Sequence, residues 1–149
     1  MGTRLSLDSW AILAWLQGEP AGEVVRDLIA WSQGDEGAGE RIKKELGGDL
    51  ERPRLFINLV NLGEVFYLLG RRRGEREARE TVEEIKAYVE VVPASEQLVF
   101  EAASLKIKYP IAYADAFALA TAKAIGAPLV TGDPEFKGLH EVPLIWIGE

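Results

Sequence analysis

Four carboxylates occupy positions from which they could act together on a substrate. Asp8 comes directly after "RLSL", which we read as a short buried strand, and Asp133 follows the apolar run "LVT" after a single glycine. Glu64 lies seven residues beyond Ile57, at the start of the helix that we expect after a second strand. If these runs are parallel strands, their carboxyl ends meet at one edge of a sheet, where functional groups collect in α/β folds.

Asp115 is the unusual member of the set because it faces an apolar surface. In "YADAFALATAKA" the residues three, four and seven positions later are Ala118, Leu119 and Ala122, which share one face of a helix. An isolated charge there would cost several kcal/mol of desolvation, whereas the helix dipole returns only about 0.3–1 kcal/mol. A bound cation is therefore the favoured reason for this aspartate, and stabilisation of the helix dipole is the alternative.

Carboxylate oxygens are the ligands that hard divalent cations such as Mg²⁺ and Mn²⁺ prefer. The chain contains no cysteine and one histidine, His140, in the polar segment "FKGLHEV". This composition excludes disulfides, thiolate nucleophiles and multi-histidine metal sites. An all-acidic site suits phosphoryl chemistry, because bound metal activates water and offsets the charge on a phosphodiester.

Strand-like and helix-like segments alternate along the 149 residues. The predicted strands are 4–7, the segment from 53 to Ile57, "VEVVPAS", "APLVTGD" and "VPLIWIG". This order predicts an α/β fold with a central, mainly parallel five-stranded sheet flanked by helices, in one domain over residues 1–149.

Local signals predict where several helices begin. Asp8 or Ser9 should cap the first helix, and Asn58 or Asn61 should cap the helix that carries Glu64. The glycine-rich segment "GDEGAG", residues 34–39, is predicted to be a flexible loop. It is not a phosphate-binding loop, since no strand precedes it and no Gly-Lys-Ser/Thr follows.

The net charge of −7 argues at first against a nucleic-acid partner. Acidity does not decide the question, because carboxylates gathered around a cation would be offset by that ion. The segment "GRRRGEREAR" supplies candidate RNA-binding residues, whose alternative role is a solvated helix end: Arg71, Arg72, Arg73 and Arg76. We expect no membrane segment, since no apolar run has the required length, and hence a cytoplasmic protein.

Around these carboxylates the sequence resembles the PIN-domain ribonucleases and, within them, the VapC toxins. The similar segments cover nearly the whole chain and are "LDSWAILAWL" (7–16), "INLVNLGEVFYLL" (57–69), "YADAFALATA" (113–122) and "LVTGDPEF" (129–136). The resemblance implies a three-layer PIN-like fold. It implies that the catalytic and metal-binding residues are Asp8, Glu64, Asp115 and Asp133, with Ser9 and Thr131 in support.

The resemblance also implies a Mg²⁺- or Mn²⁺-dependent endoribonuclease that forms a homodimer and is held inactive by a small antitoxin. Helix faces bearing Trp10, Ile12 and Trp15 are expected to receive an amphipathic segment of that antitoxin, and the alternative is that part of this surface forms the homodimer. Gly132 departs from the family, where relatives often carry arginine or another polar residue, so one phosphate contact is missing.

Two other classes of protein compete with this interpretation. A signalling receiver domain is also acidic and doubly wound, but it needs an acidic residue at the end of its third strand, and "VEVVPAS" offers none. A catalytically inactive PIN-like module would only bind a partner, and the presence of all four acids argues against it. Metal-dependent cleavage of RNA separates the nuclease from both.

Overall fold

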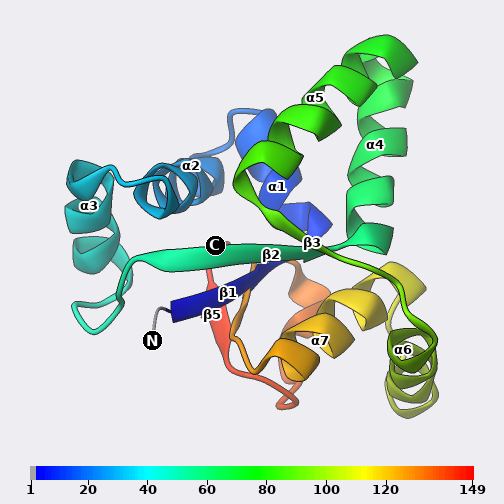
Figure 1. The fold of residues 1–149 in the computed structure, drawn as a ribbon. Helices are drawn as coiled ribbons and strands as arrows, with labels where there is room; N and C mark the ends of the chain where they lie inside the picture. Colours follow the sequence, from blue (N-terminus) through cyan, green and yellow to red (C-terminus); the bar gives the residue numbers. More distant parts are fainter. Residues whose placement is uncertain (1–2) are drawn as a thin grey trace.

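In the computed structural model, which describes residues 3–149, five short strands form one sheet whose neighbouring strands all run parallel (Figure 1). Their order is β3-β2-β1-β4-β5. The strands are β1 (Thr3–Leu7), β2 (Pro53–Asn58), β3 (Glu90–Val92), β4 (Leu129–Thr131) and β5 (Leu144–Trp146). The predicted α/β class and the five strands are confirmed, and the sheet is entirely parallel rather than mainly so.

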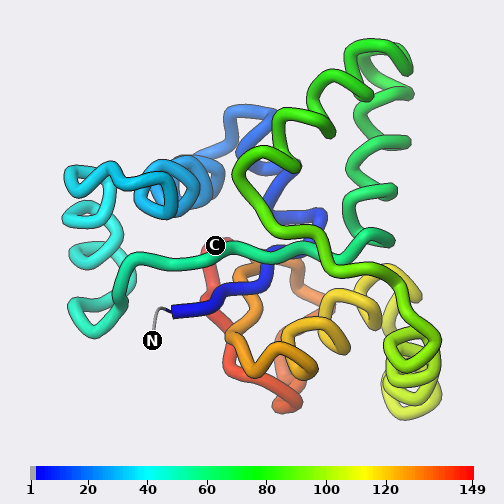
Figure 2. The backbone as a smooth tube through the Cα atoms, in the orientation of Figure 1, coloured from blue at the N-terminus to red at the C-terminus, as the bar shows by residue number. Residues whose placement is uncertain are grey.

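The described residues also form seven α-helices and one short 3₁₀ helix, η1. They are α1 (Ser9–Leu16), α2 (Pro20–Ser32), α3 (Glu36–Leu46), α4 (Leu59–Arg73), α5 (Glu75–Tyr88), α6 (Glu96–Lys108), α7 (Tyr113–Ile125) and η1 (Pro134–Phe136). Helices α1 to α5 lie on one side of the sheet, and α6 and α7 lie on the other (Figure 1). Helices α4 and α5 run side by side and extend away from the sheet (Figure 2).

In the strand order β3-β2-β1-β4-β5, the direction in which strands are added to the sheet reverses at β1. The connections from β1 to β2 and from β2 to β3 build one half of the sheet, and the connection from β3 to β4 returns past β1 to build the other half. The crevice between the carboxyl ends of β1 and β4 is therefore the topological switch point, where ligands bind in open α/β sheets. Receiver domains have the order 2-1-3-4-5, so this topology excludes that alternative.

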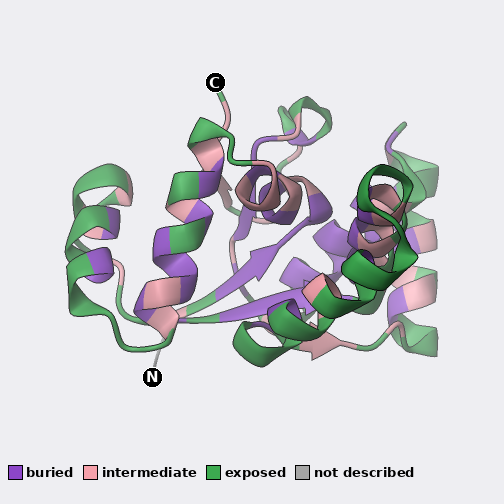
Figure 3. Ribbon diagram, turned by 90° about the horizontal axis from the view of Figure 1, so that it is seen from above, coloured by how far each residue is buried: buried purple, intermediate pink, exposed green. Residues whose placement is uncertain are grey.

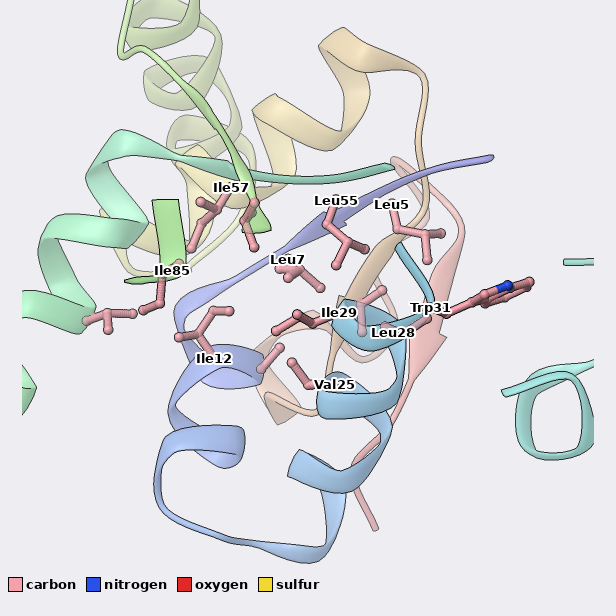
Figure 4. Packing of buried hydrophobic residues seen from close by; sticks show 14 of the residues in the cluster. Leu5, Leu7, Ile12, Val25, Leu28, Ile29, Trp31, Leu55, Ile57 and Ile85 are labelled. Carbon is pink, nitrogen blue, oxygen red and sulfur yellow. The ribbon is translucent and has the colours of Figure 1, made fainter. Parts of the chain in front are cut away.

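Buried residues lie along the strands and on the sides of the helices that face the sheet (Figure 3), and their apolar side chains hold the layers together. On one face Leu7 and Ile57 pack with Ile12, Leu28 and other residues of the first two helices (Figure 4). A second cluster joins α6, α7, β4 and η1 on the opposite face. The carboxyl-terminal halves of β1 and β2 are buried at every position because helices cover both faces of the sheet.

Side chains at the strand ends decide where two helices begin. Asp8 Oδ1 accepts a hydrogen bond of 2.8 Å from the Ala11 amide and so caps α1. Asn58 Oδ1 accepts one of 2.8 Å from the Val60 amide and caps α4. Of the pairs that the sequence left open, Asp8 and Asn58 are thus the capping residues.

The glycine-rich segment 34–39 is not a flexible loop, as the sequence suggested, because most of it forms the first turn of α3. Asp35 Oδ1 accepts a hydrogen bond of 3.1 Å from the Ala38 amide, which fixes the start of that helix. Gly39 is required there, since a Cβ atom would lie only 2.5 Å from Trp31 Nε1. A side-chain cap and a close helix contact therefore outweigh the low helix propensity of glycine.

Candidate metal centre

Asp8 projects from the end of β1 into the switch point and is almost completely buried, at 1% exposure. Its Oδ2 accepts a hydrogen bond of 2.5 Å from Thr131 Oγ1, while its Oδ1 caps α1. Burial raises the pKa of the Asp8 carboxyl to about 7, and the bonds from Thr131 and Ala11 only partly offset this effect.

Asp133 follows β4 and is oriented by its own turn. Its backbone amide donates to Thr131 Oγ1 over 3.0 Å, and its Oδ1 accepts from the Glu135 amide over 3.0 Å. Thr131 therefore contacts both strand-end acids, one through its hydroxyl proton and the other through its oxygen. This geometry explains why a threonine occupies the position two residues before Asp133.

Asp115 lies in the first turn of α7 and is 7% exposed. Burial, the hydrogen bond with Glu135 and the negative charges of Asp133, Glu135 and Asp8 together raise the pKa of this carboxyl to about 9. The apolar face predicted for this helix is confirmed, because Ala118, Leu119 and Ala122 are buried. A fully ionised cluster is therefore unfavourable here without a compensating cation.

The tightest group of acids is formed by Asp115, Asp133 and Glu135, whose carboxylate oxygens lie within 4.8 Å of one another. Glu135 was not predicted from the sequence. It is brought into the group by η1, and its Oε1 accepts from the Ala112 amide over 3.3 Å. The signal that could have found it is its place two residues after Asp133 in a tight turn containing Pro134.

Glu64 stands at the edge of this arrangement. Its Oε1 accepts a hydrogen bond from the Ser9 hydroxyl, and it is not among the three acids whose oxygens converge. Ser9, which follows Asp8 in the chain, thus contacts Glu64 rather than Asp8. The structure places Asp8, Asp115 and Asp133 in mutual electrostatic contact and holds Glu64 beside them through Ser9.

The donor atoms fit a hard divalent cation. All the converging side chains are carboxylates, which are the ligands that Mg²⁺ and Mn²⁺ prefer and that zinc or copper sites seldom use alone. Burial and, after it, the negative charges of neighbouring acids both disfavour the ionised form of Asp115, and a bound cation would offset that cost.

A close contact with Trp10 explains why glycine occupies position 132. A Cβ atom at this position would lie 2.3 Å from a carbon atom of the Trp10 ring. The ring therefore occupies the space that a larger residue would need. The ring also lines a pocket of about 540 Å³, together with Gly132 and Pro134, which precede and follow Asp133 in the chain, and with Trp146.

The predicted arginines lie on the part of the α4–α5 hairpin that is far from the sheet (Figure 1). Arg71 stacks over Tyr67 at 5.2 Å, Arg73 donates to the Leu16 carbonyl over 3.4 Å, and Arg76 forms an exposed pair with Glu80. From Glu64 to the arginines that end α4 is about 12 Å along the helix axis at 1.5 Å per residue. Their contacts are with Tyr67, Leu16 and Glu80 and not with the acids of the centre.

Comparison with known protein families decides the assignment of the fold. Residues 6–141 match the family described as PIN domain. This chain belongs to the PIN domain family. Proteins of this family are nucleases in general, and the matched segment contains all four predicted acids together with Glu135.

Solved structures share the PIN-domain fold over nearly the full length of the chain. VapBC-1 from nontypeable Haemophilus influenzae has a TM-score of 0.67 at 18% identity, with 97% of this chain and 98% of that chain covered. DNA-bound VapBC from Salmonella typhimurium has a TM-score of 0.65 at 16% identity, with 95% of this chain and 96% of that chain covered. VapC20 from Mycobacterium tuberculosis, a sarcin-ricin loop cleaving toxin, has a TM-score of 0.58 at 20% identity, with 93% of this chain and 98% of that chain covered.

Comparison with curated proteins gave no match. Among residues 3–149, no helix combines the length and the apolar content needed to span a membrane.

Proposed function

We propose that this PIN-domain chain is a metal-dependent endoribonuclease that hydrolyses RNA phosphodiester bonds. The proposed metal-binding and catalytic acids are Asp8, Glu64, Asp115 and Asp133, joined by Glu135. The observation that carries the proposal is the convergence of Asp115, Asp133 and Glu135 within 4.8 Å at the switch point, with Asp115 buried. Like charges held this close favour the binding of a divalent cation.

The residues of the chain take distinct roles in this proposal. Asp115, Asp133 and Glu135 supply oxygen ligands, and Thr131 fixes Asp8 beside them. Glu64, which accepts from the Ser9 hydroxyl, is a ligand or orients the attacking water. When bound, Mg²⁺ or Mn²⁺ would lower the pKa of that water and offset charge on the phosphodiester.

The arginines of the α4–α5 hairpin give an acidic protein a surface for phosphate. Arg71, Arg72, Arg73 and Arg76 are all exposed, and guanidinium groups pair well with phosphate oxygens. The joint substitution Arg71→Gln and Arg72→Gln should weaken RNA binding and reduce its salt dependence, because fewer counterions are then released. An unchanged salt dependence would remove these residues from the RNA surface.

The direct test of nuclease activity uses purified protein and a pool of RNA. Parent protein with Mg²⁺ or Mn²⁺ should produce discrete cut ends, and chelator should abolish them. Asp115→Asn should cleave at least about 100-fold more slowly, the order of loss when one charge-stabilising group is removed. A folded parent that binds Mn²⁺ without cutting any RNA would instead support a PIN-like module that only binds a partner.

We also propose that the enzyme is the toxin of a toxin–antitoxin pair and acts in the cytoplasm as a single domain over residues 1–149. Support comes from the fold shared with structures whose names give VapBC complexes. The acidic centre and the pocket lined by Trp10, Val24 and Trp146 suit a partner segment with basic and apolar side chains. Ile12, which the sequence offered as part of this surface, is fully buried in the core and cannot take part.

Expression in the host tests the toxin assignment separately from the nuclease assignment. The chain alone should slow growth, and co-expression with the small neighbouring open reading frame should restore growth and give a copurifying complex. Asp115→Asn is the matched control for toxicity, since expression of this variant alone should not slow growth. A harmless parent that retains no partner would reject the toxin assignment.

A homodimer is the expected state in solution, and α6 offers the surface for it. Phe100 and Ile107, one above the other on this helix, are 67% and 88% exposed. With Tyr113 at the start of α7 they form an apolar surface, which we call the α6 surface, beside a pocket of about 430 Å³. Exposed apolar side chains gathered in this way mark protein interfaces.

A further inference from the structure

Asn61 is a buried amide that holds the helix carrying Asp115. Its side chain is 0% exposed, and its Nδ2 donates a hydrogen bond of 2.9 Å to the carbonyl oxygen of Ala114. Ala114 immediately precedes Asp115 in the first turn of α7. The bond therefore fixes the stretch of backbone from which the Asp115 carboxylate projects.

A second amide anchors the same helix further along. Asn58 Nδ2 donates to Thr121 Oγ1 over 3.0 Å, and that hydroxyl donates to the Phe117 carbonyl over 2.8 Å. Thr121 lies about 9 Å along the axis from Asp115 at 1.5 Å per residue, so this contact holds the body of the helix. The two anchors form a matched pair, one next to the acid and one remote from it.

The stability of the fold alone does not explain an asparagine at position 61. Its Oδ1 has no hydrogen-bond partner among residues 3–149, and a buried polar atom without a partner destabilises the folded state. The Ala114 carbonyl can also accept from the Ala118 amide through the ordinary bonding of a helix. Leu62 and Val65 on the same helix are apolar and buried. An apolar residue would also suit position 61 if packing were its only role.

We propose that Asn61 is a positioning residue that sets the place of Asp115 relative to Asp133 and Glu135. The inference rests on the proposed function, since it takes these three acids to share a divalent cation. Their oxygens lie within 4.8 Å of one another, and functional groups must be held to about 0.5 Å of their working geometry. A small displacement of the first turn of α7 therefore weakens cation binding while the sheet and its helices persist.

The substitution Asn61→Leu removes the donor and keeps roughly the same volume, while Asn61→Gln keeps a donor. Calorimetry with Mn²⁺ alone and melting of the metal-free protein provide two independent readouts. Asn61→Leu should melt at or above the parental temperature and bind Mn²⁺ about 10-fold more weakly, the lower end of the effect of residues that orient ligands. Asn61→Gln should restore part of that affinity.

Thr121→Val is the matched control because it breaks the remote anchor of the same helix. It should melt below the parent and bind Mn²⁺ within about twofold of the parental affinity, since additive effects are expected at separated sites. Equal losses of affinity in Asn61→Leu and Thr121→Val would overturn the proposal, because they would reflect general loosening of α7.

Parental Mn²⁺ affinity in Asn61→Leu would overturn the positioning role while leaving the metal centre in place. A parent protein that binds no Mn²⁺ would overturn the proposed function and this inference together. If Asn61→Leu does not fold, Asn61→Ser, whose short side chain cannot span to Ala114, is measured and judged by the same criteria.

Discussion

The Thr131 hydroxyl donates a hydrogen bond of 2.5 Å to Asp8 and accepts one of 3.0 Å from the Asp133 amide. One side chain thus connects the acids that follow β1 and β4, the two strands on either side of the switch point. The contact with Asp8 stabilises the ionised carboxylate, since a hydrogen bond to the charged form lowers its pKa.

Thr131→Val should therefore shift metal binding to higher pH. Loss of the hydroxyl raises the pKa of Asp8 above its present value of about 7, and a ligand must lose its proton before it binds metal. We expect the pH midpoint for Mn²⁺ binding to rise by about 1 unit, the equivalent of one hydrogen bond to a charged group. Calorimetric titrations across pH measure this, and Thr131→Ser, which keeps the hydroxyl, should resemble the parent. Identical midpoints for Val and Ser would refute the role of the bond.

The metal-free protein should become less stable as pH rises. Burial raises the pKa of Asp8 from 3.8 to about 7 and that of Asp115 from 3.8 to about 9. The folded state then holds more protons than the unfolded state, so the free energy of unfolding falls between about pH 4 and pH 9. Melting in chelator from pH 5 to pH 9 should show this decline, and Asp115→Asn should flatten it. If the melting temperatures of the parent and of Asp115→Asn change with pH in parallel, protonation of Asp115 does not contribute to the pH dependence of stability.

Glu141 should have the opposite pH dependence, because its pKa is lowered. Hydrogen bonds from Lys108, Tyr109 and Lys123 reduce the pKa of this carboxyl to about 2. The contribution of ionised Glu141 to the free energy of unfolding is fully present above the ordinary pKa of a glutamate, and it is lost as pH falls toward 2. Glu141→Gln should lower the free energy of unfolding at pH 7 by about 1 kcal/mol, a small effect because solvent screens the exposed lysines that pair with this carboxylate. Near pH 2 the same substitution should have a much smaller effect. Urea unfolding measures both, and Glu101→Gln, which loses a single exposed partner, should change little.

Ile107→Glu should convert a dimer into monomers. A charge at the centre of the α6 surface would be desolvated on association, and loss of such an anchor weakens binding by at least about 2 kcal/mol, or roughly 30-fold. Sedimentation equilibrium gives the dissociation constant directly. Tyr88→Glu, at another exposed aromatic residue, should leave association unchanged. A parent that is monomeric at high concentration would remove the homodimer from the account.

The sequence was sufficient to predict which acids lie at the carboxyl edge of the sheet. Asp8 and Asp133 could be predicted because both end strands, and parallel strands bring their carboxyl ends to one edge. Asp115 could be predicted because a carboxylate on an apolar helix face needs compensation. The first argument depends on where the strands end and the second on helical periodicity, and the observed β1, β4 and buried face of α7 agree with both.

The parts that could not be predicted depend on contacts between distant segments. Glu135 joins the cluster only because η1 turns back toward Ala112, and no helical or strand period indicates such a turn. The start of α3 depends on Gly39 fitting against Trp31. Ile12 was assigned to an exposed face because one helix in isolation does not reveal which of its sides meets the sheet.

The most direct test of the metal centre compares binding and cleavage in the same titration. Mn²⁺ is added to parent protein and to Asp133→Asn while calorimetry follows binding and a fluorescent RNA follows the rate of cutting. The account predicts that binding and cleavage reach half-saturation at the same Mn²⁺ concentration in the parent. Asp133→Asn should need at least about 10-fold more Mn²⁺ for both. Parental binding and cleavage in Asp133→Asn would show that the carboxylates at the switch point are not the active site.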